Sequence, residues 1–303
     1  MSNEKGPAYV TRVRKDRFIR PFEKTPPGKV CPPVYELLHA NGCPYGCDYC
    51  YLQLTFRYQK APVVFCNMHD MLREVRQFLA LSKPEVLHSG KLCDSLVFDE
   101  ETGVSQHLVP LFAAQEKHKL LLLTKSTKIR NLLEMTDHRN TVVSFSLNAP
   151  ALAERFERGA PTPVERLDAA RRCQDAGYEV RVRIDPVIPV EGWRELYKPL
   201  VGEIVARLKT QGLRVTIGNI RYFRGLPNCA KSRGADMAVF GVPMNFDPTD
   251  GRMRVPPPLR MEMHRWFREQ FPPEVGVYPC KEPPDVWRSL GLDPTKPKCN
   301  CAL

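Results

Sequence analysis

Three cysteines lie close together in the segment of residues 41–51, which reads NGCPYGCDYCY. Cys43, Cys47 and Cys50 form a C-x3-C-x2-C pattern, and Gly42 and Gly46 allow this loop to bend tightly around a small centre. A structural zinc site and an all-cysteine iron–sulfur cluster each need four protein ligands. Three thiolates on one loop therefore predict a [4Fe–4S] cluster with one iron open to another ligand. A zinc knuckle or a redox-inert cysteine loop is the alternative.

The longer string CDYCYLQ at residues 47–53, with an aromatic residue after the last cysteine, resembles the radical S-adenosylmethionine (radical SAM) superfamily, and in particular the spore photoproduct lyase-like group. The resemblance implies a [4Fe–4S] cluster on the three cysteines, with SAM on the open iron. It also implies reductive cleavage of SAM to methionine and a 5′-deoxyadenosyl radical, which removes a hydrogen atom from the substrate. In spore photoproduct lyase the substrate is a thymine lesion in DNA, and the reaction is DNA repair.

The resemblance also implies a SAM-binding set at the ends of predicted strands. Gly90 would let the backbone approach the methionyl amine, and Lys125 would supply positive charge for a carboxylate. Ser95 and Ser146 match the remaining SAM-contacting positions. A lysine whose aliphatic stem packs on the surface is the alternative for Lys125.

Catalytic roles implied by the resemblance fall on three residues. Cys93 matches the cysteine that returns a hydrogen atom to the product radical, and Tyr49 and Tyr51 match two tyrosines proposed to relay it. The residues around Cys93 differ from the lyase pattern, which leaves the DNA-lesion substrate open. Cys93 could also be a small buried apolar residue.

A second group of cysteines lies near the end of the sequence. Cys280, Cys299 and Cys301, with Cys229 as a candidate fourth ligand, predict an auxiliary iron–sulfur or zinc site, and a flexible tail with unpaired thiols is the alternative. We interpret three other cysteines as packing residues: Cys31, Cys66 and Cys173.

Apolar runs alternate with helical patterns over most of the chain. The strands are expected at residues 34–40, 85–89, 119–124, 142–147, 178–184 and 213–220. Strict alternation predicts an α/β fold with a parallel sheet, here a partial (β/α)6 barrel. The alternative is an open, doubly wound sheet. We expect a basic N-terminal arm at residues 1–36, the barrel at 37–223, and a C-terminal appendage at 224–303 that covers the barrel mouth.

The composition fits a globular protein of 303 residues, of which 43% are apolar and 26% charged. No apolar run is long enough to cross a bilayer and no secretory signal is evident, so eleven cysteines indicate a reducing compartment, the cytoplasm. A formal charge of +11 favours an anionic partner such as DNA. The resemblance further implies an electron donor such as flavodoxin or ferredoxin. Two other functions remain: a radical SAM reaction on a small molecule or peptide, and a non-catalytic metal-binding nucleic-acid protein.

Overall fold

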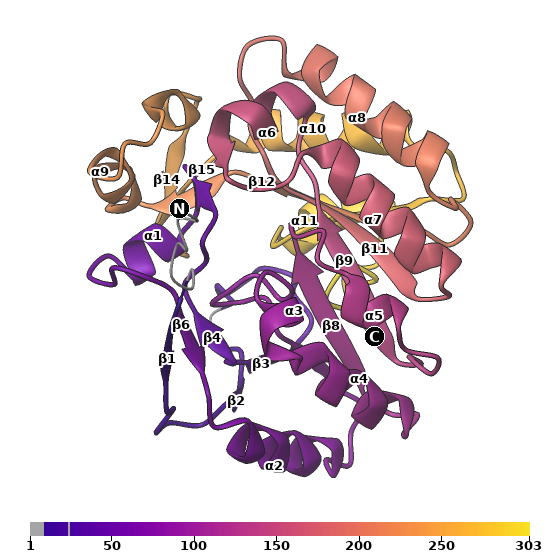
Figure 1. Cartoon of the computed structure of the whole chain (residues 1–303). Helices are drawn as coiled ribbons and strands as arrows, with labels where there is room; N and C mark the ends of the chain where they lie inside the picture. The colour runs from indigo at the N-terminus through magenta and orange to yellow at the C-terminus, as the bar shows by residue number, and fades with distance from the viewer. Residues whose placement is uncertain (1–8, 24) are drawn as a thin grey trace, which may run out of the picture.

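The computed structural model describes residues 9–23 and 25–303 (Figure 1). The first eight residues of the predicted N-terminal arm, and Lys24 within it, lie outside the described residues. The centre of the molecule is an eight-stranded sheet in the order β16-β12-β11-β9-β8-β7-β3-β2. Its strands are β2 (Ile19–Pro21), β3 (Tyr35–Leu37), β7 (Val86–His88), β8 (Lys119–Thr124), β9 (Thr141–Ser146), β11 (Glu179–Val187), β12 (Arg214–Asn219) and β16 (Gly276–Pro279).

Seven of these strands are parallel, and only β2 pairs antiparallel, with β3. From β3 to β16 the parallel strands follow one another in chain order. A doubly wound sheet would reverse its strand order at a switch point, so that alternative is excluded. Strands β2 and β16 form the two edges and do not pair with each other, so the predicted α/β partial barrel is confirmed. Strand β16 is an addition to the six predicted strands.

Helices cover the outer face of this sheet (Figure 1). They are α2 (Met68–Leu79), α3 (Asp99–Thr102), α4 (Val104–Ala113), α5 (Arg130–Leu133), α6 (Pro150–Phe156), α7 (Pro163–Asp175) and α8 (Trp193–Arg207). A capping box starts α7. The Thr162 side chain accepts a hydrogen bond from the backbone N–H of Glu165, and the Glu165 carboxylate accepts one from the backbone N–H of Thr162. None of the helices in the described ranges is long and apolar enough to cross a membrane.

The two faces of the sheet differ in chemistry because side chains alternate along each strand. On β11, Val180, Val182 and Ile184 belong to the main apolar core, which lies against the helices. Between them, Arg181 and Arg183 point to the inner side of the barrel. The same alternation separates the core leucines of β8 from Leu121, which packs in a small inner cluster. The inner face is therefore the polar one, where chemistry can take place.

Smaller elements surround the barrel. On the N-terminal side they are β1 (Val10–Arg12), β4 (Ala40–Asn41), β5 (Gly46–Cys47), α1 (Leu52–Thr55), β6 (Val63–Phe65) and β10 (Glu157–Arg158). After β12 they are β13 (Arg221–Phe223), α9 (Leu226–Lys231), the 3-10 helix η1 (Met237–Phe240), β14 (Asn245–Asp247), β15 (Arg252–Arg254), α10 (Pro257–Gln270) and α11 (Pro284–Ser289). Strands β14 and β15 pair antiparallel and form a hairpin.

The region predicted as a C-terminal appendage contributes directly to the sheet. Its strand β16 pairs in parallel with β12, and residues 299–302 turn back into the inner side of the barrel. Asn300 donates to Ser144 Oγ at 2.7 Å, and its backbone N–H donates to Thr216 Oγ1 at 2.8 Å. Cys299 and Cys301 are each only 6% exposed. The alternative prediction of a flexible C-terminal tail is therefore wrong.

Candidate active site

The three-cysteine loop begins after β3, at the carboxyl ends of the parallel strands. Its strand β5 pairs antiparallel with β10, so that Cys47 lies opposite Glu157. The buried side chain of Gln53 donates to the carbonyl of Cys47 at 2.6 Å, and the backbone N–H of Cys50 donates to the same carbonyl at 3.1 Å. These contacts hold the loop through backbone groups and do not involve its sulfurs.

The thiols of Cys43, Cys47 and Cys50 are free. Burial raises the pKa of each thiol, whereas the backbone hydrogen bonds of Tyr45 to Cys43 and of Leu52 to Cys50 lower it. Backbone groups of the loop therefore face two of the sulfurs. A buried thiol becomes a thiolate when a metal replaces its proton, so this donor set fits a cluster.

Cys43 and Cys50 line a cavity of about 460 Å³ beside the loop. In the part of the chain that the structure describes, no three His, Cys, Asp or Glu side chains already converge on one metal position. Besides burial, the charge of Cys50 raises the pKa of both Cys43 and Cys47, so the three thiols lie close to one another.

Lys125 and Ser146 lie together at the ends of β8 and β9. The ammonium of Lys125 donates to Ser146 Oγ at 2.7 Å and lies 3.6 Å from a carboxylate oxygen of Glu157. Burial raises the pKa of Cys47 and of Cys50, and the charge of Lys125 lowers both, so this cation lies beside the cysteine loop. The alternative of a surface lysine is wrong, because the Lys125 side chain is only 13% exposed.

Glu157 is a buried residue that the sequence analysis missed. Its carboxylate forms an ion pair with Arg166 at 2.6 Å and accepts hydrogen bonds from Tyr49 and Asn148. Burial alone would raise the pKa of Glu157, but Lys125 and Arg166 lower it to about 2. The carboxylate is therefore charged at neutral pH and anchors Tyr49, which lies between Cys47 and Cys50 in the loop. A single Glu has no sequence pattern that would have identified it.

Gly90 and Ser95 are fixed against the end of β8. A Cβ at Gly90 would lie 2.7 Å from the carbonyl oxygen of Leu123, so no other residue fits without a shift. Ser95 Oγ accepts from the backbone N–H of Leu123 at 2.9 Å and from Ser89 Oγ at 2.7 Å. Gly90 itself donates to His88 Nδ1 at 3.0 Å, so His88 positions this turn.

Asp94, between Cys93 and Ser95, also escaped the sequence analysis. Its carboxylate accepts from Thr124 Oγ1 and from the backbone N–H of Lys125, both at 2.6 Å. Asp94 thereby joins the loop after β7 to the end of β8, which Lys125 directly follows.

Cys93 and Tyr51 occupy different surroundings. Cys93 is 3% exposed and packs in a small apolar cluster with Ala40, Val64, Val97 and Phe98, close enough to Cys43 to influence its pKa. Tyr51 is 47% exposed, and its hydroxyl donates to the carbonyl of Lys91. The charges of Glu36, Arg183 and Arg252, on three different strands, influence its pKa. Tyr51 therefore faces the inner side of the barrel, whereas Cys93 lies beneath the loop.

Arg183, Asp185 and Arg221 form an ionic group on the inner side. Asp185 pairs with Arg183 at 2.5 Å and with Arg221 at 3.1 Å. Burial alone would raise the pKa of Asp185, but the two arginines keep it far below its usual range. Gly218 leaves space for this carboxylate, since a Cβ there would lie 2.4 Å from Asp185 Cγ.

Comparisons with known proteins agree with this geometry. A family model described as spore photoproduct lyase matches residues 21–224. The spore photoproduct lyase of Clostridium acetobutylicum is 23% identical over 196 residues, which are 64% of this chain and 58% of that protein. The enzyme of Bacillus subtilis is 28% identical over 176 residues, 57% of this chain and 52% of that protein. The matched parts thus span about half the length of these relatives.

Solved structures are similar over a larger part of the chain. A mutant of spore photoproduct lyase covers 90% of this chain and 82% of its own, with a TM-score of 0.77 and 22% identity. A double mutant with bound AdoMet and dinucleoside spore photoproduct has a TM-score of 0.74 and 21% identity, and covers 89% of this chain and 81% of its own. At this identity the similarity establishes the fold. Together with the family model, it shows that the chain belongs to the spore photoproduct lyase family.

Proposed function

We propose that this chain is a radical SAM enzyme that holds a [4Fe–4S] cluster on Cys43, Cys47 and Cys50 and acts on a thymine-derived lesion in DNA. The observation that supports this best is the position of Lys125 and Ser146, which meet 2.7 Å apart beside the cysteine loop of a family member. When bound, the cluster supplies the electron that cleaves SAM to methionine and a 5′-deoxyadenosyl radical.

The residues of the chain bind and orient SAM in this proposal. Lys125 supplies the positive charge for the SAM carboxylate, and Ser146 orients the Lys125 ammonium. Gly90 allows the methionyl amine to approach the backbone, and Ser95 holds that turn against β8. Glu157 fixes Tyr49 and partly balances the charge of Lys125.

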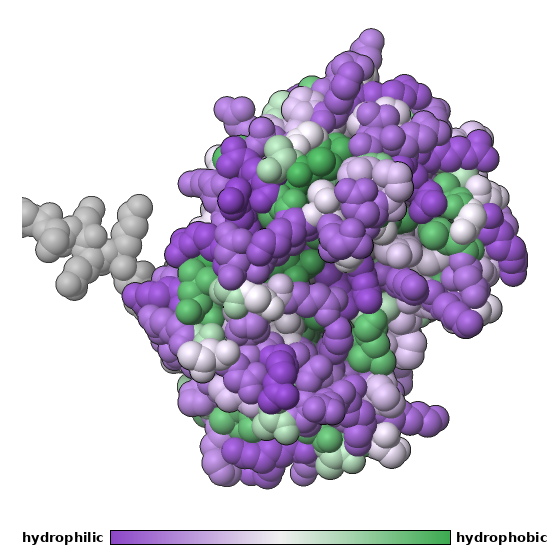
Figure 2. All heavy atoms as spheres, turned by 90° about the vertical axis from the view of Figure 1, so that its right-hand side faces the viewer, coloured by the Kyte–Doolittle hydropathy of each residue, from purple (hydrophilic) through white to green (hydrophobic). Residues whose placement is uncertain are grey.

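The partners follow from charge and chemistry. A net charge of +11 suits DNA and also an acidic electron carrier such as flavodoxin or ferredoxin. The face turned to the viewer in Figure 2 is largely hydrophilic, with scattered apolar patches, as expected of a surface that meets water and polar partners. We place the enzyme in the cytoplasm because thiol-ligated clusters need reducing conditions.

Anaerobic reconstitution with iron, sulfide, SAM and dithionite tests this proposal. We expect 5′-deoxyadenosine from the wild type and thymine repair on lesion-bearing DNA. Absence of 5′-deoxyadenosine would refute the radical SAM chemistry. Production of 5′-deoxyadenosine without any repair of that DNA would refute the lesion as substrate.

A second candidate is a radical SAM reaction on a small molecule or peptide. The burial of Cys93 among apolar side chains favours it, because a hydrogen donor for a DNA lesion must reach the substrate. Comparison of the products of wild type and Cys93→Ala on lesion DNA separates the two candidates.

A further inference from the structure

Four cysteines from three separate segments meet at the inner side of the barrel. The guanidinium of Arg183 lies 3.3 Å from Cys280 Sγ and 3.9 Å from Cys301 Sγ, so one side chain touches both sulfurs. Cys31 and Cys301 line a common cavity of about 690 Å³. Cys299 and Cys301 share one tight turn, in which the backbone N–H of Ala302 donates to the Cys299 carbonyl at 3.0 Å.

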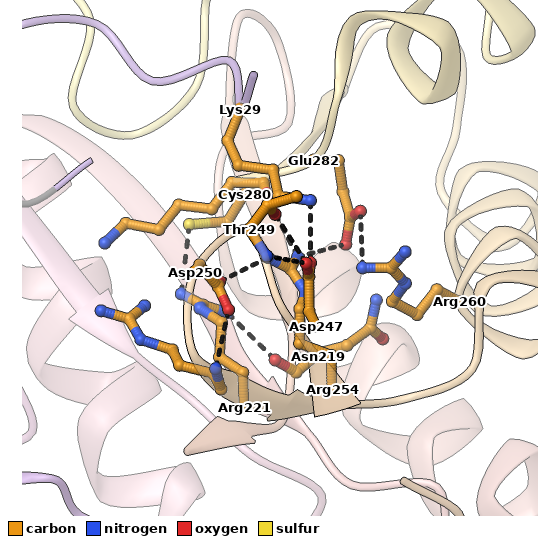
Figure 3. Close-up of polar contacts among 12 residues, drawn as sticks. Lys29, Asn219, Arg221, Asp247, Thr249, Asp250, Arg254, Arg260, Cys280 and Glu282 are labelled. Carbon is orange, nitrogen blue, oxygen red and sulfur yellow. Dashed lines mark hydrogen bonds and ion pairs between the residues drawn. The ribbon is translucent and has the colours of Figure 1, made fainter. Parts of the chain in front are cut away.

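The segments that contain Cys31 and Cys280 are joined by a buried polar network (Figure 3). The backbone N–H of Val30 donates to the carbonyl of Glu282 at 2.9 Å, and Lys29 pairs with Asp247 at 3.0 Å. Arg254 lies 3.1 Å from Asp250 and 3.3 Å from Glu282, and Arg260 lies 3.2 Å from Glu282. This network lies next to two cysteines that are distant in sequence, and it sets their spacing.

The turn with Cys299 and Cys301 is held from the sheet. Arg181, only 1% exposed, donates to the carbonyls of Asn300 and Ala302 at 2.7 and 2.5 Å. Cys301 also packs against Val86, Leu121 and Val142, near the starts of their strands. Each of the three segments is therefore also held by hydrogen bonds that do not involve the sulfurs.

Positive charge surrounds these sulfurs. Arg221 lies 3.6 Å from Cys280 Sγ, and Arg183 lies 3.3 Å from the same sulfur and 3.9 Å from Cys301 Sγ. Four thiolates around Zn²⁺ or around a [4Fe–4S]²⁺ core carry a net charge of −2 in either case. The cations therefore compensate the charge that such a centre would bring into the barrel.

We infer that Cys31, Cys280, Cys299 and Cys301 form a second metal centre, bound by four thiolates and separate from the Cys43-Cys47-Cys50 loop. Zinc and an iron–sulfur cluster share this ligand chemistry. Cys229, the fourth ligand considered from sequence, lies on α9 instead and contacts the carbonyl of Gln53 at 3.1 Å, and Cys31 takes its place.

The test uses the full chain with Cys43, Cys47 and Cys50 all replaced by Ala, purified anaerobically. Iron, sulfide and zinc are measured per chain. We expect one remaining centre: iron with sulfide identifies a cluster, and zinc without sulfide identifies a zinc site. Adding Cys31→Ser should remove most of this metal, whereas the matched control Cys229→Ser should retain it. Absence of metal in the starting variant, or metal retained after Cys31→Ser, would overturn the inference.

A second measurement does not depend on how the variants fold. The wild-type chain, loaded with metal, is treated with a thiol-alkylating reagent before and after metal removal, and modified cysteines are mapped by mass spectrometry. We expect Cys31, Cys280, Cys299 and Cys301 to be protected as a set only when metal is present. Protection that is independent of metal, or a disulfide between two of them in the anaerobic protein, would contradict a metal centre. Since SAM cleavage is not the readout, failure of the proposed function would leave this result unaffected.

Discussion

The loop of Cys43, Cys47 and Cys50 and the group of Cys31, Cys280, Cys299 and Cys301 are built in different ways. The loop is one short stretch of chain, anchored by Glu157 through Tyr49 and the pairing of β5 with β10. The second group draws on three stretches, anchored by Arg181 and by the network around Glu282. The first set lies in one short segment and can be identified from the spacing of its cysteines in the sequence. The second set exists only because the sheet brings distant segments together.

The largest expected difference between the two sets concerns SAM cleavage. Cys50→Ala should abolish the formation of 5′-deoxyadenosine, because two thiolates do not hold the cluster. Cys299→Ser should retain it, because this residue contacts neither the loop nor Lys125. The measurement is 5′-deoxyadenosine per chain under dithionite. Equal loss in both variants would show that the two sets act as one site.

The anchor of the loop should matter strongly for stability. Glu157→Gln leaves Arg166 buried without a counter-ion, which costs about 3–5 kcal/mol of the free energy of unfolding. Urea denaturation measures this loss. The matched control is Glu154→Gln on the preceding helix α6, where the exposed side chain should change stability by less than about 0.5 kcal/mol.

The same anchor predicts a pH dependence. Folding lowers the pKa of Glu157 from 4.5 to about 2, so its contribution is complete above pH 4.5 and is lost as the pH falls toward 2. The stability difference between wild type and Glu157→Gln should therefore shrink over that interval. A difference that stays constant down to pH 2 would show that the ion pair with Arg166 is not its source.

The anchor of the second group should have a smaller effect. Asn300→Ala removes the partner of Ser144 on the inner face and should cost about 1–3 kcal/mol. The variant should also lose metal from the second centre while it retains SAM cleavage. The control is Asn245→Ala in the exposed hairpin, which also removes an asparagine side chain but should change neither stability nor metal content. Unchanged metal content in Asn300→Ala would argue that the turn does not position Cys299 and Cys301.

The smallest effect on stability is expected for Cys93, a cysteine that belongs to neither set. Cys93→Ala should cost about 1 kcal/mol, because only one small buried group is removed. If Cys93 is the hydrogen donor, the variant should still cleave SAM but release aberrant products from lesion DNA, and Tyr51→Phe should share part of this defect. Normal thymine repair by Cys93→Ala would rule out the donor role.

The sequence predicted the local features of this molecule well. A strand rich in leucine was predicted at residues 119–124, and strand β8 covers Lys119–Thr124. The resemblance assigned Lys125 and Ser146 to one binding set, and the structure brings the two side chains together at the ends of neighbouring strands. These features depend on residues that are neighbours in sequence or occupy equivalent positions on neighbouring strands.

The missed features are those that depend on distant contacts. Strand β16 is only four residues long and ends in Pro279 within a proline-rich region, so its pattern is too short to identify. Cys31 was interpreted as a packing residue, because nothing near it indicates that the end of the chain lies beside it. Glu157 has no motif, and only the fold shows that Arg166 and Lys125 surround it.

The hydrogen bonds of Asn300 have a consequence for the order of folding. They join residues 156 and 84 positions apart, to Ser144 and Thr216. Contacts between such distant residues form slowly, because a long loop must close before any of them is gained. The helices and central strands can therefore assemble first, and the inner side of the barrel closes last. A chain interrupted at this stage would expose Val86, Leu121 and Val142, the apolar residues that Cys301 covers in the complete fold.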